Sequence, residues 1–168
     1  MTRLEKVFDK KGSKNKVLVT YTVAGDPSLT SSKKILNDLI ASGSDILEIG
    51  VPFSDPMSEG PVIQKAHERA LKKNIQLDDI LNLCKQIRDK NSNVPIVLMG
   101  YMSNIFRYPI DKFVKDLASV DADGCLVVDA PHELREENQL RNALNKENLS
   151  MIKLVAPTTT DERLKKLS

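Results

Sequence analysis

The sequence has little of several features that define whole classes of protein. Its 25 lysines and arginines nearly balance 23 aspartates and glutamates, so a net charge of +2 gives no strong attraction to nucleic acid or anionic lipid. No run approaches the roughly 18 apolar residues that a membrane helix needs. Residues 1–6 mix acid and base and lack the apolar core of a secretory signal. We therefore expect a cytoplasmic protein without nucleic-acid or membrane partners.

Only two cysteines are present, Cys84 and Cys125, and both lie within apolar runs. Their positions suit neither a metal site nor a disulfide. We interpret them as reduced thiols in a globular core, which an apolar content of 40% is sufficient to build. No bound metal is expected.

Apolar runs alternate with amphipathic stretches, which predicts buried parallel strands joined by helices. The expected strands are residues 17–23, 45–51, 94–101, 124–129 and 151–155, with two helices between the second and the third. A chain of 168 residues has room for one α/β domain over residues 1–168.

Two parallel architectures compete for this pattern. The strand count favours an open doubly wound sheet, whereas a (β/α)₈ barrel needs eight strands and about 200 residues or more. The chain contains no GxGxxG or GxxxxGK[ST] phosphate motif that would support a nucleotide site. Polar residues gather after the strand ends, where both architectures place active sites.

Glu48 is the most unusual polar residue of the expected strands, because it lies in an otherwise apolar run. An ionised carboxylate is costly there unless it is paired. Burial would raise its pKa toward the range that general acid–base catalysis uses; a structural glutamate bonded to a neighbouring donor is the alternative. Glu59 follows in a loop rich in proline and glycine, where a carboxylate is usually solvated.

The most specific motifs follow Glu48: Val-Pro-Phe-Ser-Asp-Pro over residues 51–56 and Gly-Pro-Val-Ile-Gln over residues 60–64. Related motifs follow the other strands, at residues 24–27, 98–101, 127–131 and 154–164. Together they resemble the tryptophan synthase alpha chain family over nearly the whole chain. The resemblance implies an α/β fold of the TIM-barrel family, here an incomplete barrel of about five parallel strands with flanking helices.

The resemblance also implies an activity, that of a lyase of tryptophan biosynthesis. Such a lyase cleaves indole-3-glycerol phosphate to indole and glyceraldehyde 3-phosphate by retro-aldol chemistry. Glu48 matches the family's catalytic glutamate, and Glu59 matches an aspartate that holds the indole N–H. The chain would need no cofactor of its own, because pyridoxal phosphate belongs to the beta chain with which the family forms an α2β2 complex.

Three further positions are substrate-binding candidates by the same resemblance. Tyr21 and Tyr101 match aromatic positions that flank the indole, although core packing with a bonded hydroxyl fits them as well. Asp129, at a strand end, is either structural or a support of the site. The sequence departs from the family at Glu59, one methylene longer than aspartate, and a misplacement of about 1 Å can cost on the order of 100-fold in rate.

The two histidines carry weaker signals. His67 has charged neighbours on what the pattern indicates to be the polar side of a helix, so we expect it at the solvated surface. His132 follows Pro131 at a strand end and is a minor candidate for a role near the site or the beta-chain surface.

By this count strands six to eight are missing, together with the loops after strands seven and eight that commonly bind phosphate in such barrels. Five strands would leave two open edges and an apolar inner face, so we expect self-association or assembly with a complementary piece. Two functions stay open: a lyase that is complete only with the missing part, and a catalytically silent fragment that packs against itself or a beta chain.

Overall fold

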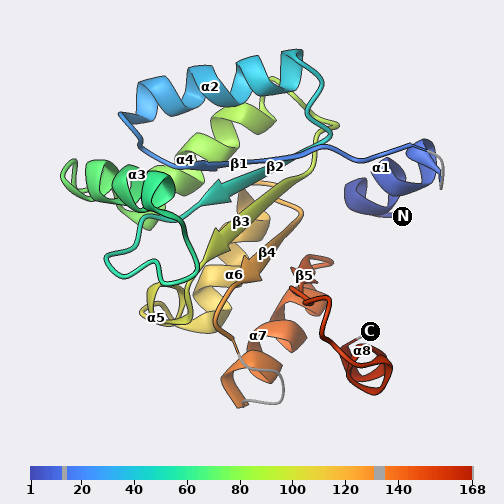
Figure 1. Ribbon diagram of the computed structural model, residues 1–168. Coiled ribbons are helices and arrows are strands. Elements are labelled where there is room, and N and C mark those ends of the chain that lie inside the picture. Colours follow the sequence, from blue (N-terminus) through green and yellow to red (C-terminus); the bar gives the residue numbers. More distant parts are fainter. Residues whose placement is uncertain (13–14, 131–134, 168) are drawn as a thin grey trace.

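The computed structural model describes residues 1–12, 15–130 and 135–167, and a single parallel sheet organises them (Figure 1). Its strands lie in the order β1-β2-β3-β4-β5, so that each strand pairs with its neighbours in the sequence. The strands are β1 (Val19–Val23), β2 (Ile46–Gly50), β3 (Ile96–Gly100), β4 (Gly124–Val127) and β5 (Ser150–Ile152). Each overlaps one of the expected apolar runs. A doubly wound sheet reverses its strand order at a switch point, and this sheet does not, so the barrel-type arrangement is confirmed.

Helices follow the strands as the alternating pattern predicts. They are α1 (Arg3–Lys11), α2 (Leu29–Ala41), α3 (Pro61–Leu71), α4 (Leu77–Arg88), α5 (Met102–Ile105), α6 (Ile110–Ser119), α7 (Arg135–Lys146) and α8 (Asp161–Leu167). Two of them, α3 and α4, connect β2 to β3, as expected. The single turn of α5 is not predicted by the sequence pattern. None of the helices in the described part of the chain has the length and apolar character needed to cross a bilayer.

The main core lies between the sheet and the helices that cover its outer face. Alternate strand residues such as Leu47, Ile49 and Leu98 point into this layer and pack against apolar residues of the helices. Cys84 and Cys125 are both free and buried there, which confirms the interpretation of two reduced core thiols.

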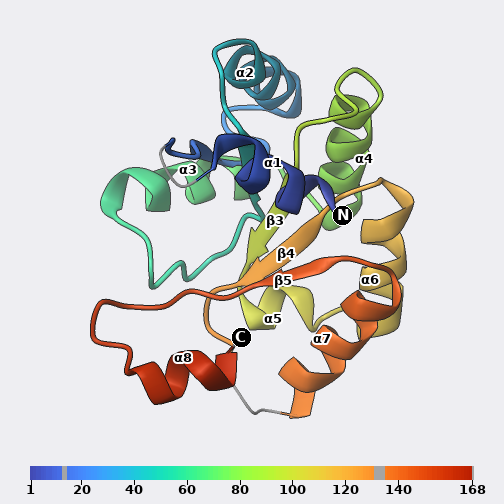
Figure 2. The same ribbon diagram turned by 90° about the vertical axis from the view of Figure 1, so that its right-hand side faces the viewer.

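A second, smaller cluster lies on the inner face of the sheet. It consists of Ile46, Val97, Met99 and Leu126, packed against Leu4 and Val7 of α1. Figure 2 shows α1 near the end of the sheet at which β3 and β4 begin. The N-terminal helix therefore covers part of the apolar face that an incomplete barrel leaves open.

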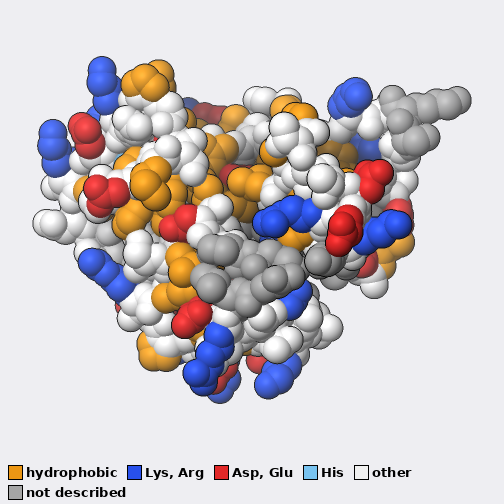
Figure 3. Space-filling view, turned by 60° about the horizontal axis from the view of Figure 1, so that its bottom comes forward, with side chains coloured by type: hydrophobic (Ala, Val, Ile, Leu, Met, Phe, Trp, Pro, Cys, Tyr) orange, Lys and Arg blue, Asp and Glu red, His pale blue; other side chains and the backbone are white. Residues whose placement is uncertain are grey.

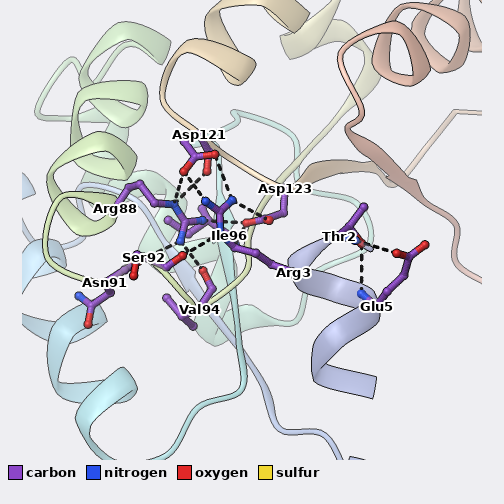
Figure 4. A network of polar contacts seen from close by, with 10 residues as sticks. All are labelled: Thr2, Arg3, Glu5, Arg88, Asn91, Ser92, Val94, Ile96, Asp121 and Asp123. Atoms are coloured by element: carbon purple, nitrogen blue, oxygen red, sulfur yellow. Dashed lines mark hydrogen bonds and ion pairs between the residues drawn. The ribbon is translucent and has the colours of Figure 1, made fainter. Parts of the chain in front are cut away.

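Buried ionic contacts fix that end of the sheet (Figure 4). The Asp123 carboxylate, 4% exposed, accepts hydrogen bonds from the Ile96 amide and the Arg88 guanidinium, both at 2.8 Å. Arg3 of α1 donates to both Asp121 and Asp123. One network thus joins α1 and α4 to the segments that lead into β3 and β4.

The two outer strands of the sheet remain unpaired on one side among the described residues. β1 pairs only with β2, and β5 pairs only with β4. On β1 the side chain of Val19 is 46% exposed, and Leu18 just before it is exposed as well. Such edges offer free N–H and C=O groups to a further strand.

Candidate active site

Glu48 and Tyr21 lie opposite each other on β2 and β1. Side chains alternate along a strand, so Glu48 shares the inner face of the sheet with Ile46, two residues before it. Its place in β2 is two residues before the carboxyl end of the strand. This is the end of a barrel strand at which catalytic residues are found.

The position of Tyr21 depends on a glycine. A Cβ atom built on Gly50 would lie 2.3 Å from the Tyr21 hydroxyl oxygen and 2.8 Å from two ring carbons. The phenol ring therefore lies against Gly50 of β2, in a space that the side chain of any larger residue at position 50 would occupy.

The Glu48 carboxyl group is half buried, and burial raises its pKa; the negative charge of Glu59 raises it further. Burial likewise raises the pKa of Glu59. Within the described residues no donor hydrogen-bonds the Glu48 carboxylate, so the structure lacks the partner that a purely structural glutamate would require. Both carboxyl groups therefore keep their protons to a higher pH than an ordinary glutamate.

The loop over residues 51–60 returns to the sheet and brings Glu59 to this place. Its Ser58 amide donates to the Tyr101 hydroxyl at 3.2 Å, and its Phe53 ring stacks on Tyr101 with centroids 4.9 Å apart. Asn104 of α5 donates to the Pro52 carbonyl at 2.8 Å. Tyr101 is completely buried, so in this structure its ring and hydroxyl hold the loop; contact with an indole stays a prediction.

His67 contradicts its interpretation as a solvated surface residue, which is wrong: the side chain is 1% exposed. Its Nδ1 accepts the Phe53 amide at 3.0 Å, and its Nε2 lies 3.4 Å from the Tyr21 hydroxyl. Burial lowers its pKa. The reason is tertiary, because the loop over residues 51–60 covers this side of α3. A signal was nevertheless present, since His67 lies four residues after Ile63 and three before Ala70, on the apolar stripe of α3.

The structure thus brings together Tyr21, Glu48 and Glu59. Burial raises the pKa of Tyr21, and the charges of Glu59 and then Glu48 raise it further.

Asp129 lies apart from this group: it is exposed and accepts the Met102 amide at 2.6 Å, linking the end of β4 to α5. His132 and its predicted role lie outside the described residues. In the described part of the chain no three His, Cys, Asp or Glu side chains gather as a metal site.

Comparison with known proteins adds a direct observation. The family model described as tryptophan synthase alpha chain matches residues 8–168, almost the entire chain. The chain belongs to the tryptophan synthase alpha chain family. The tryptophan synthase alpha chain of Legionella pneumophila (strain Paris) is 42% identical over 165 residues, and that of Methylibium petroleiphilum is 44% identical over 168 residues.

Solved structures of the tryptophan synthase family share the fold. The crystal structure of tryptophan synthase subunit alpha from Legionella pneumophila str. Paris matches 99% of this chain with a TM-score of 0.93 and 41% identity. The aminoacrylate-bound form of tryptophan synthase from M. tuberculosis matches 98% of it with a TM-score of 0.89 and 35% identity. These relatives are TIM barrels, which confirms the expected fold class.

The match covers only part of each relative. The chain spans about 60% of the length of both curated tryptophan synthase alpha chains, covering 98% of its own residues in each case. It spans 63% and 66% of the two solved chains. About 60% of an eight-stranded barrel corresponds to five strands, and five strands form a sheet with two open edges.

Proposed function

We propose that this chain contributes the acid–base carboxylates of a carbon–carbon lyase that cleaves indole-3-glycerol phosphate to indole and glyceraldehyde 3-phosphate. The observation that carries the proposal is the pair of Glu48 and Glu59, whose pKa values are both raised by burial at the carboxyl end of β2. Membership of the tryptophan synthase alpha chain family supports the reaction class.

The chemistry requires two proton movements. Indole C3 must gain a proton and the side-chain hydroxyl must lose one before the C–C bond breaks, and the electrons of that bond then return to the indole ring. A carboxyl group with a raised pKa keeps its proton to a higher pH than an ordinary glutamate, which suits Glu48 to act as the general acid and base. Glu59 accepts the indole N–H and stabilises the positive charge that forms on the ring, with Tyr21 beside both.

The remaining three candidate residues have different proposed roles. Tyr21 lies near both carboxylates and, in this proposal, flanks the indole. Tyr101 acts through the loop over residues 51–60, because it bonds Ser58 and stacks on Phe53. Asp129 supports the site from the end of β4 through the Met102 amide.

The proposed protein partner is the beta chain of tryptophan synthase, in an α2β2 complex. Two apolar residues next to Glu59 are strongly exposed, Met57 at 78% and Val62 at 77%. Figure 3 shows the side of the molecule toward which β3 and β4 point. Hydrophobic side chains gather there between acidic and basic ones. We place the complex in the cytoplasm, where the two buried thiols would stay reduced.

Indole release from indole-3-glycerol phosphate tests the proposal. The 168-residue chain is assayed alone, with a beta chain, and with a beta chain plus the remaining segment of a relative's barrel. We expect release in the last mixture, because that segment closes the sheet and carries the loops that commonly bind phosphate.

The decisive variant is Glu48→Gln, which keeps the shape of the side chain and removes its proton chemistry. We expect a loss of about 100-fold or more in kcat. Glu68→Gln, exposed on α3, is the matched control and should keep the wild-type rate. No release in any mixture would instead support a catalytically silent fragment, and equal rates for Glu48→Gln and wild type would contradict the assignment.

A further inference from the structure

A series of hydrogen bonds and one ring stack connects Tyr21 to the loop over residues 51–60, and His67, which the proposed reaction does not use, lies within it. The series links the Tyr21 hydroxyl to His67 Nε2, and His67 Nδ1 to the Phe53 amide. Phe53 then stacks on Tyr101, whose hydroxyl accepts the Ser58 amide next to Glu59. His67, on α3, is the one member that touches both β1 and the loop over residues 51–60.

We propose that His67 is a positioning residue of the carboxylate site: as a neutral imidazole it fixes the Phe53 amide and directs the Tyr21 O–H toward Glu59. The expected effect of His67 on catalysis rests on the proposed function; its hydrogen bonds to Phe53 and Tyr21 do not.

The hydrogen bonds around the imidazole set its tautomer. An amide N–H can only donate, so Nδ1, which receives the Phe53 amide at 3.0 Å, carries no proton. In the neutral ring the proton is then on Nε2, which donates to the Tyr21 oxygen across a long contact of 3.4 Å. Burial lowers the pKa of His67 and so favours this uncharged form.

The Tyr21 hydroxyl proton must consequently point elsewhere. Its oxygen is already an acceptor on the His67 side, and the ring cannot shift toward β2, because it lies against the backbone at Gly50. The charged groups that act on this hydroxyl are Glu59 and, more weakly, Glu48. A hydroxyl donor favours the ionised form of a carboxylate, so a Tyr21 O–H directed at Glu59 would oppose the rise that burial gives the Glu59 pKa.

The surroundings of His67 fit a neutral ring. Tyr21 of β1 and Phe53 of the loop occupy its two nitrogens. The charged neighbours on its own helix, Glu68 and Arg69, are exposed, and Arg69 is engaged in a bidentate pair with Asp26 at 2.7 and 2.8 Å. No carboxylate in the described part of the chain forms an ion pair with His67 that would hold it protonated.

Amide hydrogen exchange on the 168-residue chain tests the link to the loop. His67→Ala should speed exchange of the Phe53 amide by about tenfold, the effect of losing one hydrogen bond. His67→Asn should restore most of the protection, because the asparagine oxygen can accept the same amide. The Ser58 amide, held by Tyr101, should stay protected in both and report an intact fold; equal Phe53 exchange in wild type and His67→Ala would overturn the proposal.

Carboxyl titration by NMR tests the link to Glu59. Tyr21→Phe and His67→Asn should both raise the pH at which Glu59 titrates, since each removes or misdirects the donor. Tyr108→Phe is the matched control and should leave the titration unchanged. An unchanged Glu59 titration in Tyr21→Phe would contradict the proposed direction of the O–H.

Kinetics separates this proposal from the proposed function. In an active complex, His67→Asn should lower kcat about tenfold and leave KM unchanged, because the contact orients reacting groups rather than binding substrate. An equal loss in Glu68→Gln or a change in KM alone would count against it. A complex without any lyase activity would refute the proposed function, while exchange and titration would still decide the position of His67.

Discussion

Burial raises the pKa of the Glu48 carboxyl group, and the negative charge of Glu59, eleven positions further along the chain, raises it again. The two residues come from β2 and from the loop that follows it. Their proximity lowers the stability of the fold, because two neighbouring, half-buried carboxyl groups cannot both ionise easily. Such a cost is characteristic of a site selected for chemistry rather than for stability.

Glu48→Gln should therefore stabilise the protein at neutral pH. A carboxyl group with a raised pKa is harder to ionise in the folded than in the unfolded state, so stability is lost as pH rises above about 4.3, the ordinary value for glutamate. The variant removes this cost, and its advantage should vanish below about pH 4, where both states of the wild type are protonated. Urea unfolding at both pH values measures it; a Glu48→Gln protein that is less stable at neutral pH would contradict the buried, unpaired carboxyl.

Glu59→Gln should lower the pKa of Glu48, because it removes the second of the two causes of the shift. Glu59→Asp keeps the charge and serves as the control, so Glu48 should remain shifted upward in it. NMR titration of the side-chain carboxyl carbons distinguishes the two. Identical Glu48 titrations in wild type and Glu59→Gln would show that the charges do not interact.

Asp123→Ala should be strongly destabilising, by about 3 kcal/mol or more, because it removes the buried carboxylate that the Arg88 guanidinium contacts at 2.8 Å and leaves only the longer pair with the exposed Asp121. Arg3→Ala removes more exposed contacts to the same network and should cost about 1 kcal/mol or less. Lys34→Ala, which breaks an exposed pair with Asp38, should leave the urea midpoint unchanged. Equal midpoints for Asp123→Ala and Lys34→Ala would refute a structural role for the network.

The open edges of the sheet predict self-association of the 168-residue chain. Val19 on the edge strand β1 is 46% exposed, and a lysine there should disfavour pairing with another strand. Light scattering should show oligomers for the wild type and a larger monomer fraction for Val19→Lys. Val62→Lys makes the same change from an apolar to a charged side chain, but on α3 rather than on the edge strand, so it should behave as the wild type. A compact wild-type monomer would refute the prediction.

Much of the fold follows from periodicity alone, because buried parallel strands and amphipathic helices leave different patterns. The apolar runs around Glu48 and Met99 located β2 and β3 to within two residues. The choice between an open sheet and a barrel did not follow from the strand count, which favoured the wrong alternative. The order of the strands decides it, and that order is a property of the whole sheet.

The site was predicted less completely, for a physical reason. Glu48 is conspicuous because a carboxylate within an apolar strand is rare. His67 was misplaced because its charged neighbours suggested a solvated face, although it lies on the apolar stripe of α3; its contact with the Phe53 amide, 14 positions earlier, is tertiary and is not visible in the pattern of α3. Tyr101, by contrast, fits the alternative of core packing with a bonded hydroxyl, because it is fully buried and its hydroxyl accepts the Ser58 amide 43 positions away.

The ion pair between Arg3 and Asp123 also affects the order in which the protein folds during its synthesis. These two residues are 120 positions apart, so the start of the chain cannot dock until β4 begins to leave the ribosome. At synthesis rates of about 5–20 residues per second, α1 waits on the order of ten seconds without its final contacts. During that interval its apolar face is free to meet chaperones or neighbouring nascent chains.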